Sequence, residues 1–447
     1  MSDELPKGWA EIDLPEIASL NMGQSPPSDT YNTKRRGLPF FQGKTEFGDL
    51  YPTPEKFCSA PNKIAEADDI LISVRAPVGP TNLCRERSCI GRGLAAIRPR
   101  GEIPVRYLLF YLRSIEAWLA TQGTGSTFTA ISKSDLEQLR VRLAPLAEQQ
   151  RIVAKLETLL GQVDACQQRL EKLPTLLKRF RQSVLAAACS GRLTADWREE
   201  NNNIQAADSL IKKAQFQIAG PENELSELPE KWQWVALGNY VHCFRGRFSP
   251  RPRNDPRYFN GRHPFIQIGN LPREGGLVNS HVQTLNDEGL AVSRKFPKGT
   301  VVIAIVGATI GNTGVLAYDM CVTDSIVGLE TGDKLGNRYV ELFLRHKKDD
   351  IRQTSYSSGG QPNINLATLN PYPLALPPLP EQKEIVRRTE SLFALADQLE
   401  LRLAQARGQV GKLTPSLLAR AFAGKLVPQD PADEPAAKLL ERIKAAK

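Results

Sequence analysis

The chain has 447 residues, which is enough for two or three domains of about 150 residues each. Hydrophobic residues make up 41% and charged residues 24%, as in ordinary globular proteins, and no run of about 18 apolar residues predicts a membrane helix. The 58 Lys and Arg exceed the 49 Asp and Glu, and the net charge of +9 permits a polyanionic partner. The seven cysteines form no Cys-x-x-Cys pair and the four histidines lack metal-ligand spacing, so we expect neither disulfides nor a metal site, which fits a reducing cytoplasm.

An internal repeat organises the sequence. Four short segments return in the same order: residues 5–9 as 228–232, 39–42 as 264–267, 145–149 as 378–382, and 191–193 as 424–426. The offset between the copies grows from 223 to 233 in the first part of the repeat and is constant afterwards. Loops tolerate insertions, whereas one extra residue in a packed helix rotates its buried face by about 100°. Each copy is therefore predicted to be a loop-rich domain followed by a rigid helical region.

The loop-rich parts, residues 1–145 and 228–377, are predicted to be mixed α/β domains. Residues 69–75 and 300–306 are apolar and rich in β-branched side chains, and a proline or glycine follows each run. This pattern is typical of a strand that enters a tight turn.

Basic residues gather in both loop-rich parts. Residues 245–262 hold six arginines against one aspartate, with aromatic residues between them. Arginine suits phosphate oxygens and the acceptor edge of guanine, and Gln and Asn suit adenine, so these residues are candidates for DNA contacts. A solvated surface, or a local turn hydrogen bond for each amide, is the alternative interpretation. The residues predicted to bind DNA are Lys34, Arg35, Arg36, Gln42, Lys44, Arg75 and Arg92 in the first copy, and Arg245, Arg247, Arg251, Arg253, Gln267 and Asn270 in the second.

Heptads begin after each loop-rich part. The apolar positions recur with a 4,3 spacing, which predicts the seam of a coiled coil. An amphipathic helix packed on its own globular domain is the alternative. At about 1.5 Å per residue, residues 152–173 would span about 32 Å and residues 385–413 about 42 Å, which lie on either side of one turn of B-DNA, about 34–36 Å. Pro174 is expected to kink or end the first helix. The predicted seam and partner residues are Ile152, Leu156, Leu159, Val163 and Leu170, followed by Ile385, Leu392, Leu399 and Leu403.

The motifs of the common catalytic classes are missing. The sequence has no Gly-x-x-x-x-Gly-Lys-Ser/Thr phosphate loop, no nucleophile elbow and no His-Glu-x-x-His metalloprotease motif. It also lacks the Asn/Asp-Pro-Pro-aromatic loop with which an amino-methyltransferase holds an extruded base. The sequence therefore predicts a recognition protein without chemistry of its own.

These segments resemble the specificity subunits of Type I restriction-modification enzymes. The resemblance rests on the Pro-Leu-x-Glu-Gln segments that open each heptad region, at 145–149 and 378–382, on residues 177–193 with their copy at 416–426, and on Leu-Pro-x-x-Trp at the start of each half. Order, spacing and duplication agree over essentially the whole chain.

The resemblance implies an α+β fold in which two pseudo-repeated α/β target-recognition domains are separated by two long helices that form an antiparallel coiled coil. It divides the chain into a first target-recognition domain (1–145), a central helical region (146–200), a linker with a short helix (201–227), a second target-recognition domain (228–377), a C-terminal helical region (378–427) and a tail helix (428–447).

It also implies partners. Each recognition domain would contact one half of a split site in double-stranded DNA, and the coiled coil would dock two methyltransferase (modification) subunits and, through them, restriction subunits. S-adenosylmethionine and ATP would be bound by those partners and not by this chain. A stand-alone DNA methyltransferase or nuclease, and a coiled-coil scaffold that does not bind DNA, are the alternatives.

Overall fold

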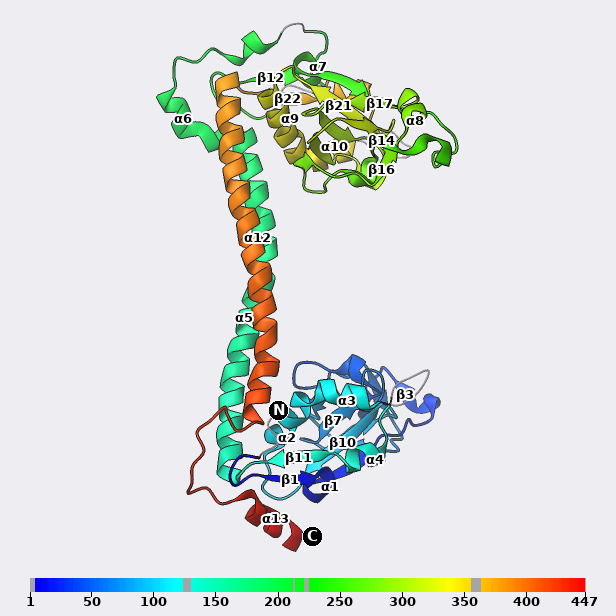
Figure 1. Cartoon of the computed structure of the whole chain (residues 1–447), viewed down its shortest axis with the longest axis vertical. Helices are drawn as coiled ribbons and strands as arrows, with labels where there is room; N and C mark the ends of the chain where they lie inside the picture. Colours follow the sequence, from blue (N-terminus) through cyan, green and yellow to red (C-terminus); the bar gives the residue numbers. More distant parts are fainter. Residues whose placement is uncertain (1–4, 124–129, 212–213, 221–224, 355–362, 447) are drawn as a thin grey trace. The chain divides into compact units, whose positions relative to one another are not determined.

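The chain folds into two compact units. The computed structural model describes residues 5–123, 130–211, 214–220, 225–354 and 363–446. Unit 1 comprises residues 1–171 and 404–447, and unit 2 comprises residues 172–403. The chain passes from one unit to the other only twice, and both passages lie inside the two long helices, α5 (Leu146–Cys189) and α12 (Leu379–Ala421) (Figure 1).

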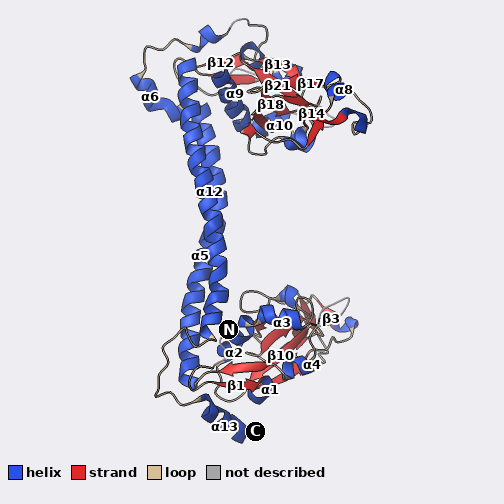
Figure 2. Cartoon of the chain, in the orientation of Figure 1, coloured by secondary structure: helices blue, strands red, loops and turns tan. Residues whose placement is uncertain are grey.

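Unit 1 is an α/β domain with short strands (Figure 2). Its strands are β1 (Ala10–Asp13), β2 (Ala18–Met22), β3 (Tyr31–Asn32), β4 (Leu38–Phe41), β5 (Lys56–Cys58), β6 (Ile64–Ala65), β7 (Ile70–Ser73), β8 (Thr81–Leu83), β9 (Ser88–Ile90), β10 (Leu94–Pro99) and β11 (Arg140–Leu143). Its shorter helices are α1 (Leu14–Ile17), α2 (Val105–Ser114), α3 (Glu116–Gln122), α4 (Lys133–Glu137) and α13 (Ala436–Ala445). The strands form three sheets, in the orders β1-β11, β2-β10-β7-β8 and β3-β5-β4-β9-β6.

Unit 2 repeats this plan. Its strands are β12 (Gln233–Ala236), β13 (His242–Arg245), β14 (Phe259–Ile266), β15 (Leu277–Val278), β16 (Gln283–Leu285), β17 (Arg294–Phe296), β18 (Val301–Ala304), β19 (Thr313–Leu316), β20 (Met320–Val322), β21 (Ile326–Glu330) and β22 (Pro373–Leu376). Its shorter helices are α6 (Ala195–Glu200), α7 (Leu237–Tyr240), α8 (Asp287–Ala291), α9 (Lys334–His346), α10 (Lys348–Thr354) and α11 (Leu366–Leu369). The sheet orders are β12-β22, β13-β21-β18-β19-β15 and β16-β14-β20-β17.

The repeated sequence segments occupy equivalent strands in the two units. The predicted strand near residue 70 is β7 and its copy is β18, and every residue of both is buried. Each lies next to a neighbouring antiparallel strand, β10 in unit 1 and β21 in unit 2. Short parallel pairs also correspond: β4 pairs with β9, and β14 pairs with β20. These apolar, β-branched runs form strands because both faces are covered.

The Leu-Pro-x-x-Trp and Glu-Gln motifs form the same junction in each unit. The indole Nε1 of Trp9 donates to Glu148 Oε2 at 3.0 Å, and that of Trp232 donates to Glu381 Oε2 at 2.8 Å. The next residue, a buried glutamine, donates its amide to a backbone carbonyl just before the long helix in both copies. A buried carboxylate and amide are costly without such partners, so each repeated motif fixes the start of a long helix to its own domain.

The long helices run antiparallel within each unit. In unit 1 the guanidinium of Arg407 donates to the carbonyl oxygen of Leu170 at 3.0 Å. In unit 2 Arg181 forms ion pairs with Asp397 at 2.7 Å and Glu400 at 3.1 Å. Residue numbers rise along α5 as they fall along α12, which confirms the antiparallel pairing. Pro174 does not end the first helix, because α5 continues to Cys189. Proline cannot donate to the carbonyl four residues earlier, and that carbonyl, on Leu170, accepts from Arg407 instead.

The predicted seam is only partly buried. Ile152 and Leu156 lie in the globular core of unit 1, and Ile385 lies in that of unit 2. At these positions the helices pack on their own domains, which was the alternative to a coiled-coil seam. Val163 and Leu403 are buried, and Leu159, Leu170 and Leu392 are half-buried. Leu399 does not lie in a buried seam, since its side chain is 41% exposed. A contact between only two helices leaves apolar flanks in water, and further leucines are exposed on the same helices: Leu173, Leu176, Leu395, Leu401 and Leu413.

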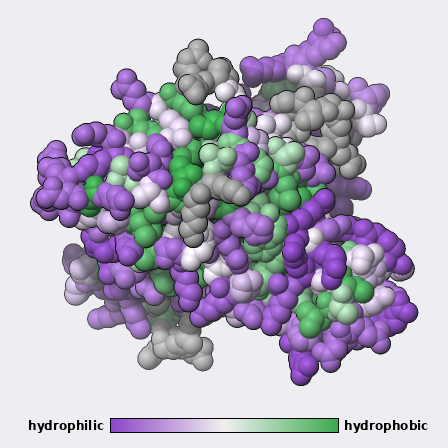
Figure 3. All heavy atoms as spheres, turned by 90° about the horizontal axis from the view of Figure 1, so that it is seen from above, coloured by the Kyte–Doolittle hydropathy of each residue, from purple (hydrophilic) through white to green (hydrophobic). Residues whose placement is uncertain are grey.

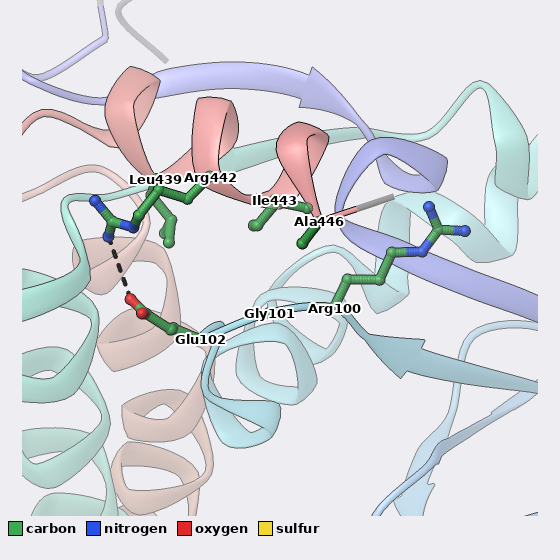
Figure 4. A pocket seen from close by; sticks show the side chains of 7 residues that line it. All are labelled: Arg100, Gly101, Glu102, Leu439, Arg442, Ile443 and Ala446. Carbon is green, nitrogen blue, oxygen red and sulfur yellow. Dashed lines mark hydrogen bonds and ion pairs between the residues drawn. The ribbon is translucent and has the colours of Figure 1, made fainter.

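The C-terminal helix α13 completes unit 1. Its residues Leu439 and Ile443 are buried and belong to the same apolar core as β7 and α2. Figure 4 shows α13 above the loop that follows β10, where Arg442 forms an ion pair with Glu102 at 3.2 Å. Gly101 in that loop has φ +61°, and a Cβ there would lie 2.9 Å from Cγ1 of Ile443. The glycine therefore permits both the turn and the close approach of the helix.

The ion pairs of Glu384 on α12 make the stability of unit 2 depend on pH. Arg387 donates to this carboxylate at 2.6 and 2.7 Å, and Arg388 donates at 2.6 Å while also pairing with Asp196. The hydrogen bonds from Arg387 and then Arg388 lower the pKa of Glu384 from 4.5 to about 2. A depressed carboxyl pKa stabilises the fold above the unfolded pKa, and this contribution is lost as the pH falls from about 4.5 to about 2.

We expect the Glu384→Gln variant to lose less of its free energy of unfolding than the wild type when the pH is lowered from 5 to 3. Urea unfolding followed by circular dichroism measures this difference. The control is Glu171→Gln, because Glu171 is exposed and forms no ion pair in the described part of the chain. Equal pH dependence of the wild type and the Glu384→Gln variant would show that the pairs contribute nothing.

Figure 3 shows one face on which hydrophilic side chains prevail towards the edges and hydrophobic side chains gather nearer the middle. Within the residues that the structure describes, no helix is long and apolar enough to span a bilayer.

Candidate DNA-binding surfaces

Unit 1 gathers four predicted residues around one hollow. A cavity of about 520 Å³ lies at the strand ends, and its lining includes Gln42, Lys44, Arg75 and Arg92. Gln42 follows β4, Arg75 follows β7, and Arg92 lies between β9 and β10. Because β4 and β9 are parallel, the residues that follow them emerge at the same edge. No acidic side chain is among the residues that line this cavity, so it presents three cationic groups and one amide.

Two glycines that the sequence interpretation missed make this hollow possible. A Cβ on Gly93 would lie 2.2 Å from the carbonyl oxygen of Gln42, and a Cβ on Gly91 would lie 3.3 Å from the Cα of Gln42. The loop that carries Arg92 therefore lies directly against the backbone that carries Gln42. The Gly-Arg-Gly sequence is the signal from which this close approach can be predicted.

We expect Gly93→Ala to destabilise unit 1 by about 1–3 kcal/mol, because the added methyl group overlaps a backbone oxygen that cannot move independently. Thermal unfolding measures the loss. Gly43→Ala is the matched control, since it lines the same cavity and its added Cβ meets nothing within 4 Å. Equal melting temperatures for the two variants would contradict the close packing of this loop.

Lys34, Arg35 and Arg36 lie elsewhere in unit 1. They occupy the exposed turn between β3 and β4 and are not among the residues that line the cavity. The side chain of Asn32 holds this turn: its Oδ1 accepts from the backbone N–H of Lys34 and Arg36, and its Nδ2 donates to the carbonyl of Arg36. The three basic side chains are presented to solvent, where phosphate contacts are sterically open.

The arginines of unit 2 are organised by an aspartate. Arg253 pairs with Asp324 at 2.9 Å and Arg251 lies 3.8 Å from it, while Arg245 donates to the backbone carbonyl of Asp324 at 2.6 Å. The sequence interpretation missed Asp324, because it lies 71 residues from Arg253 along the chain. Arg247 donates instead to the carbonyls of residues 291 and 293.

Asp324 occupies the repeat position that Arg92 has in unit 1. Cys89 and Cys321 are equivalent in the parallel pairs, and Arg92 and Asp324 both follow three residues later. One unit therefore places a guanidinium at this point, whereas the other places a carboxylate that holds two guanidinium groups beside it. The two surfaces differ in charge pattern although their folds correspond.

The two amides of unit 2 have local partners. Asn270 Oδ1 accepts from the backbone N–H of Gln267 at 2.9 Å, which is the turn hydrogen bond given as the alternative for this residue. The side chain of Gln267 is exposed and donates to Gln283 Oε1 at 2.8 Å. Gln267 is thus available at the surface, whereas Asn270 shapes the turn. A base contact by either residue stays a prediction.

The residues that the structure describes contain no group of three or more His, Cys, Asp or Glu side chains that would hold a metal ion. Both surfaces are built from side chains suited to phosphates and base edges.

The chain belongs to the family of the Type I restriction modification DNA specificity domain, whose model matches residues 6–175 and 229–405. Each match covers one recognition domain and most of the heptad region that follows it, so the chain carries two copies of the specificity domain.

Similar proteins agree with this assignment. The specificity subunit of the Type I restriction enzyme EcoDI from Escherichia coli is 29% identical, over 99% of this chain and 96% of that protein. The EcoBI specificity subunit, also from Escherichia coli, is 29% identical over 98% of this chain and 92% of that protein. The crystal structure of the HsdS subunit from Thermoanaerobacter tengcongensis shares the fold, with a TM-score of 0.63 at 20% identity over 95% of this chain and 99% of that one.

Proposed function

We propose that the chain is the non-catalytic DNA specificity subunit of a Type I restriction-modification complex. It recognises a split site in double-stranded DNA, with one half contacted by each unit. The observation that carries the proposal is the cavity of unit 1, which is lined by Gln42, Lys44, Arg75 and Arg92 and by no acidic side chain, within a domain of the specificity family.

The difference between the two surfaces supports two different half-sites. In unit 1 the guanidinium of Arg92 lines the cavity, whereas in unit 2 Asp324 pairs with Arg253 at the equivalent position. The two surfaces therefore present different donors and acceptors to a base edge. Exposed lysines and arginines around each surface would position the phosphate backbone without reading sequence.

The long helices are the proposed docking surface for two modification subunits and, through them, restriction subunits. Apolar side chains exposed in water are typical of protein interfaces, and Leu176, Leu395 and Leu401 are 49–65% exposed on these helices. In this proposal S-adenosylmethionine and ATP belong to the partners, as the missing catalytic motifs favour. The complex would act in the cytoplasm, where the DNA is.

Titration of the full chain with duplex DNA at several salt concentrations tests DNA binding. A protein that contacts at least four phosphates shows log K falling with log salt with a slope of about −4 or steeper. A flat response would favour a scaffold that does not bind DNA.

Methyl transfer assayed with S-adenosylmethionine and duplex DNA tests the absence of catalysis. The purified chain alone is expected to transfer nothing, and transfer is expected only after a modification subunit is added. Methylation or cleavage by the chain alone would favour the enzyme alternative.

A further inference from the structure

A basic cavity in unit 2 contains none of the residues that were predicted to bind DNA. It has a volume of about 500 Å³ and lies between the end of α5, the α9–α10 corner and the loop after residue 271. Figure 1 shows α9 beside the part of the long helices that belongs to unit 2. Five cationic side chains line it, Lys178, Arg181, Arg273, Arg345 and Lys348, against two acidic ones, Glu274 and Asp349.

Three of these cations form no salt bridge with a carboxylate among the residues that the structure describes. Lys178, Arg273 and Arg345 make no side-chain hydrogen bond or ion pair there. Arg345 is half-buried and packs its guanidinium over the ring of Phe393 at 4.8 Å. The nearby carboxylate of Glu341 is engaged instead by the backbone N–H of Gly276 and the hydroxyl of Thr313.

The remaining cations are held in place around the cavity. Lys348 donates its Nζ to the carbonyl of Arg273 at 2.8 Å. Arg181 pairs with acids of α12 and also lies over the ring of Phe393, at 5.7 Å. Burial lowers the pKa of Lys348 and of Arg345, and the nearby carboxylate of Glu274 offsets part of this effect on both.

The repeat supplies an internal comparison. Unit 1 has a cavity of about 470 Å³ at the equivalent place, lined by Arg113, Glu116 and Thr414 where unit 2 has Arg345, Lys348 and Arg181. Arg113 is satisfied there, because its guanidinium donates to the carbonyls of Asp49 and Thr81. The fold therefore forms this cavity without needing a cluster of positive charge, and packing alone does not account for the charge found in unit 2.

We propose that this unit 2 cavity binds phosphate groups. The size and the converging cations suit either the phosphates of a free nucleotide or consecutive phosphates of a DNA backbone. The proposal does not depend on sequence recognition by the two DNA-binding surfaces.

The test uses the full chain and the double variant Lys178→Ala/Lys348→Glu. Glutamate is the residue that unit 1 carries at the position of Lys348, so the backbone accommodates it. The matched control is Lys172→Glu combined with Lys155→Ala, which changes the net charge equally at two exposed positions of α5 outside the cavity. Thermal unfolding verifies that all three proteins fold.

Calorimetric titrations with pyrophosphate, with ATP and with a duplex of arbitrary sequence distinguish the two sources. If a free nucleotide is the ligand, pyrophosphate and ATP bind the wild type and the control saturably, and the cavity variant binds them about tenfold or more weakly. If the DNA backbone is the ligand, the slope of log K against log salt for the duplex becomes shallower by about 1–2 in the cavity variant and stays that of the wild type in the control. Indistinguishable binding of all three probes by the cavity variant and the control would overturn the proposal.

Discussion

Replacing Lys44, Arg75 and Arg92 together with alanine is expected to weaken binding of the chain to its target DNA about 100-fold or more. The three cations line one cavity that holds no acidic side chain, so they act on the same stretch of DNA. Contacts of this kind contribute about 1–3 kcal/mol each, and about 1.4 kcal/mol corresponds to a tenfold change in affinity. Because three phosphate or base contacts disappear, the slope of log K against log salt is expected to become shallower by about 2–3.

The matched control removes the same charge from other parts of unit 1. Lys7, Lys155 and Lys438 are exposed and do not line the cavity. Their triple alanine variant is expected to bind DNA within about twofold of the wild type. Fluorescence anisotropy with one labelled duplex measures all three proteins. Equal losses in the two triple variants would show that only net charge matters and would remove the cavity from the account.

Deleting one heptad from each long helix is expected to shorten the gap in the recognised site by about three base pairs. Residues 167–173 of α5 and 404–410 of α12 are suitable, because Leu170 and Arg407 at their centres are hydrogen-bonded and therefore lie side by side. Seven residues of helix span about 10 Å, and one base pair spans about 3.4 Å. Both half-sites should stay unchanged, since no residue of either surface is removed.

Mapping of methylated bases in cells that carry the shortened chain measures the gap. The control deletes the heptad of α5 only, which leaves the two helices unequal in length and is expected to abolish methylation instead of resetting the gap. An unchanged gap in the double deletion would show that the helices do not set the spacing.

The architecture could be predicted from the sequence because the repeated motifs mark residues that contact each other although they lie far apart in the chain. Trp9 and Trp232 stand at equivalent positions, and each donates to the glutamate that opens a long helix. Burial of such polar pairs tolerates few substitutions, so the motifs stay recognisable in both copies. The heptads likewise predicted two long helices, and their antiparallel pairing followed from the family resemblance.

Burial and ion pairing could not be predicted from the sequence where they depend on residues distant in the chain. The heptad pattern gave Leu399 the same role as Leu403, but only Leu403 is buried, because a two-helix contact covers one side of each helix. The arginines of unit 2 were visible as a cluster, whereas Asp324, which holds Arg251 and Arg253, enters from a strand end far along the chain. Pairing of this kind depends on sheet register, which composition does not specify.

The most direct measurement of recognition of a split site by the two units is the methylome of cells with and without this chain. We predict one methylated motif made of two short sequences separated by a fixed gap, present only with the chain. When Lys44, Arg75 and Arg92 are replaced, only one half of this motif should change. An identical methylome in both strains, or a continuous motif without a gap, would contradict this prediction.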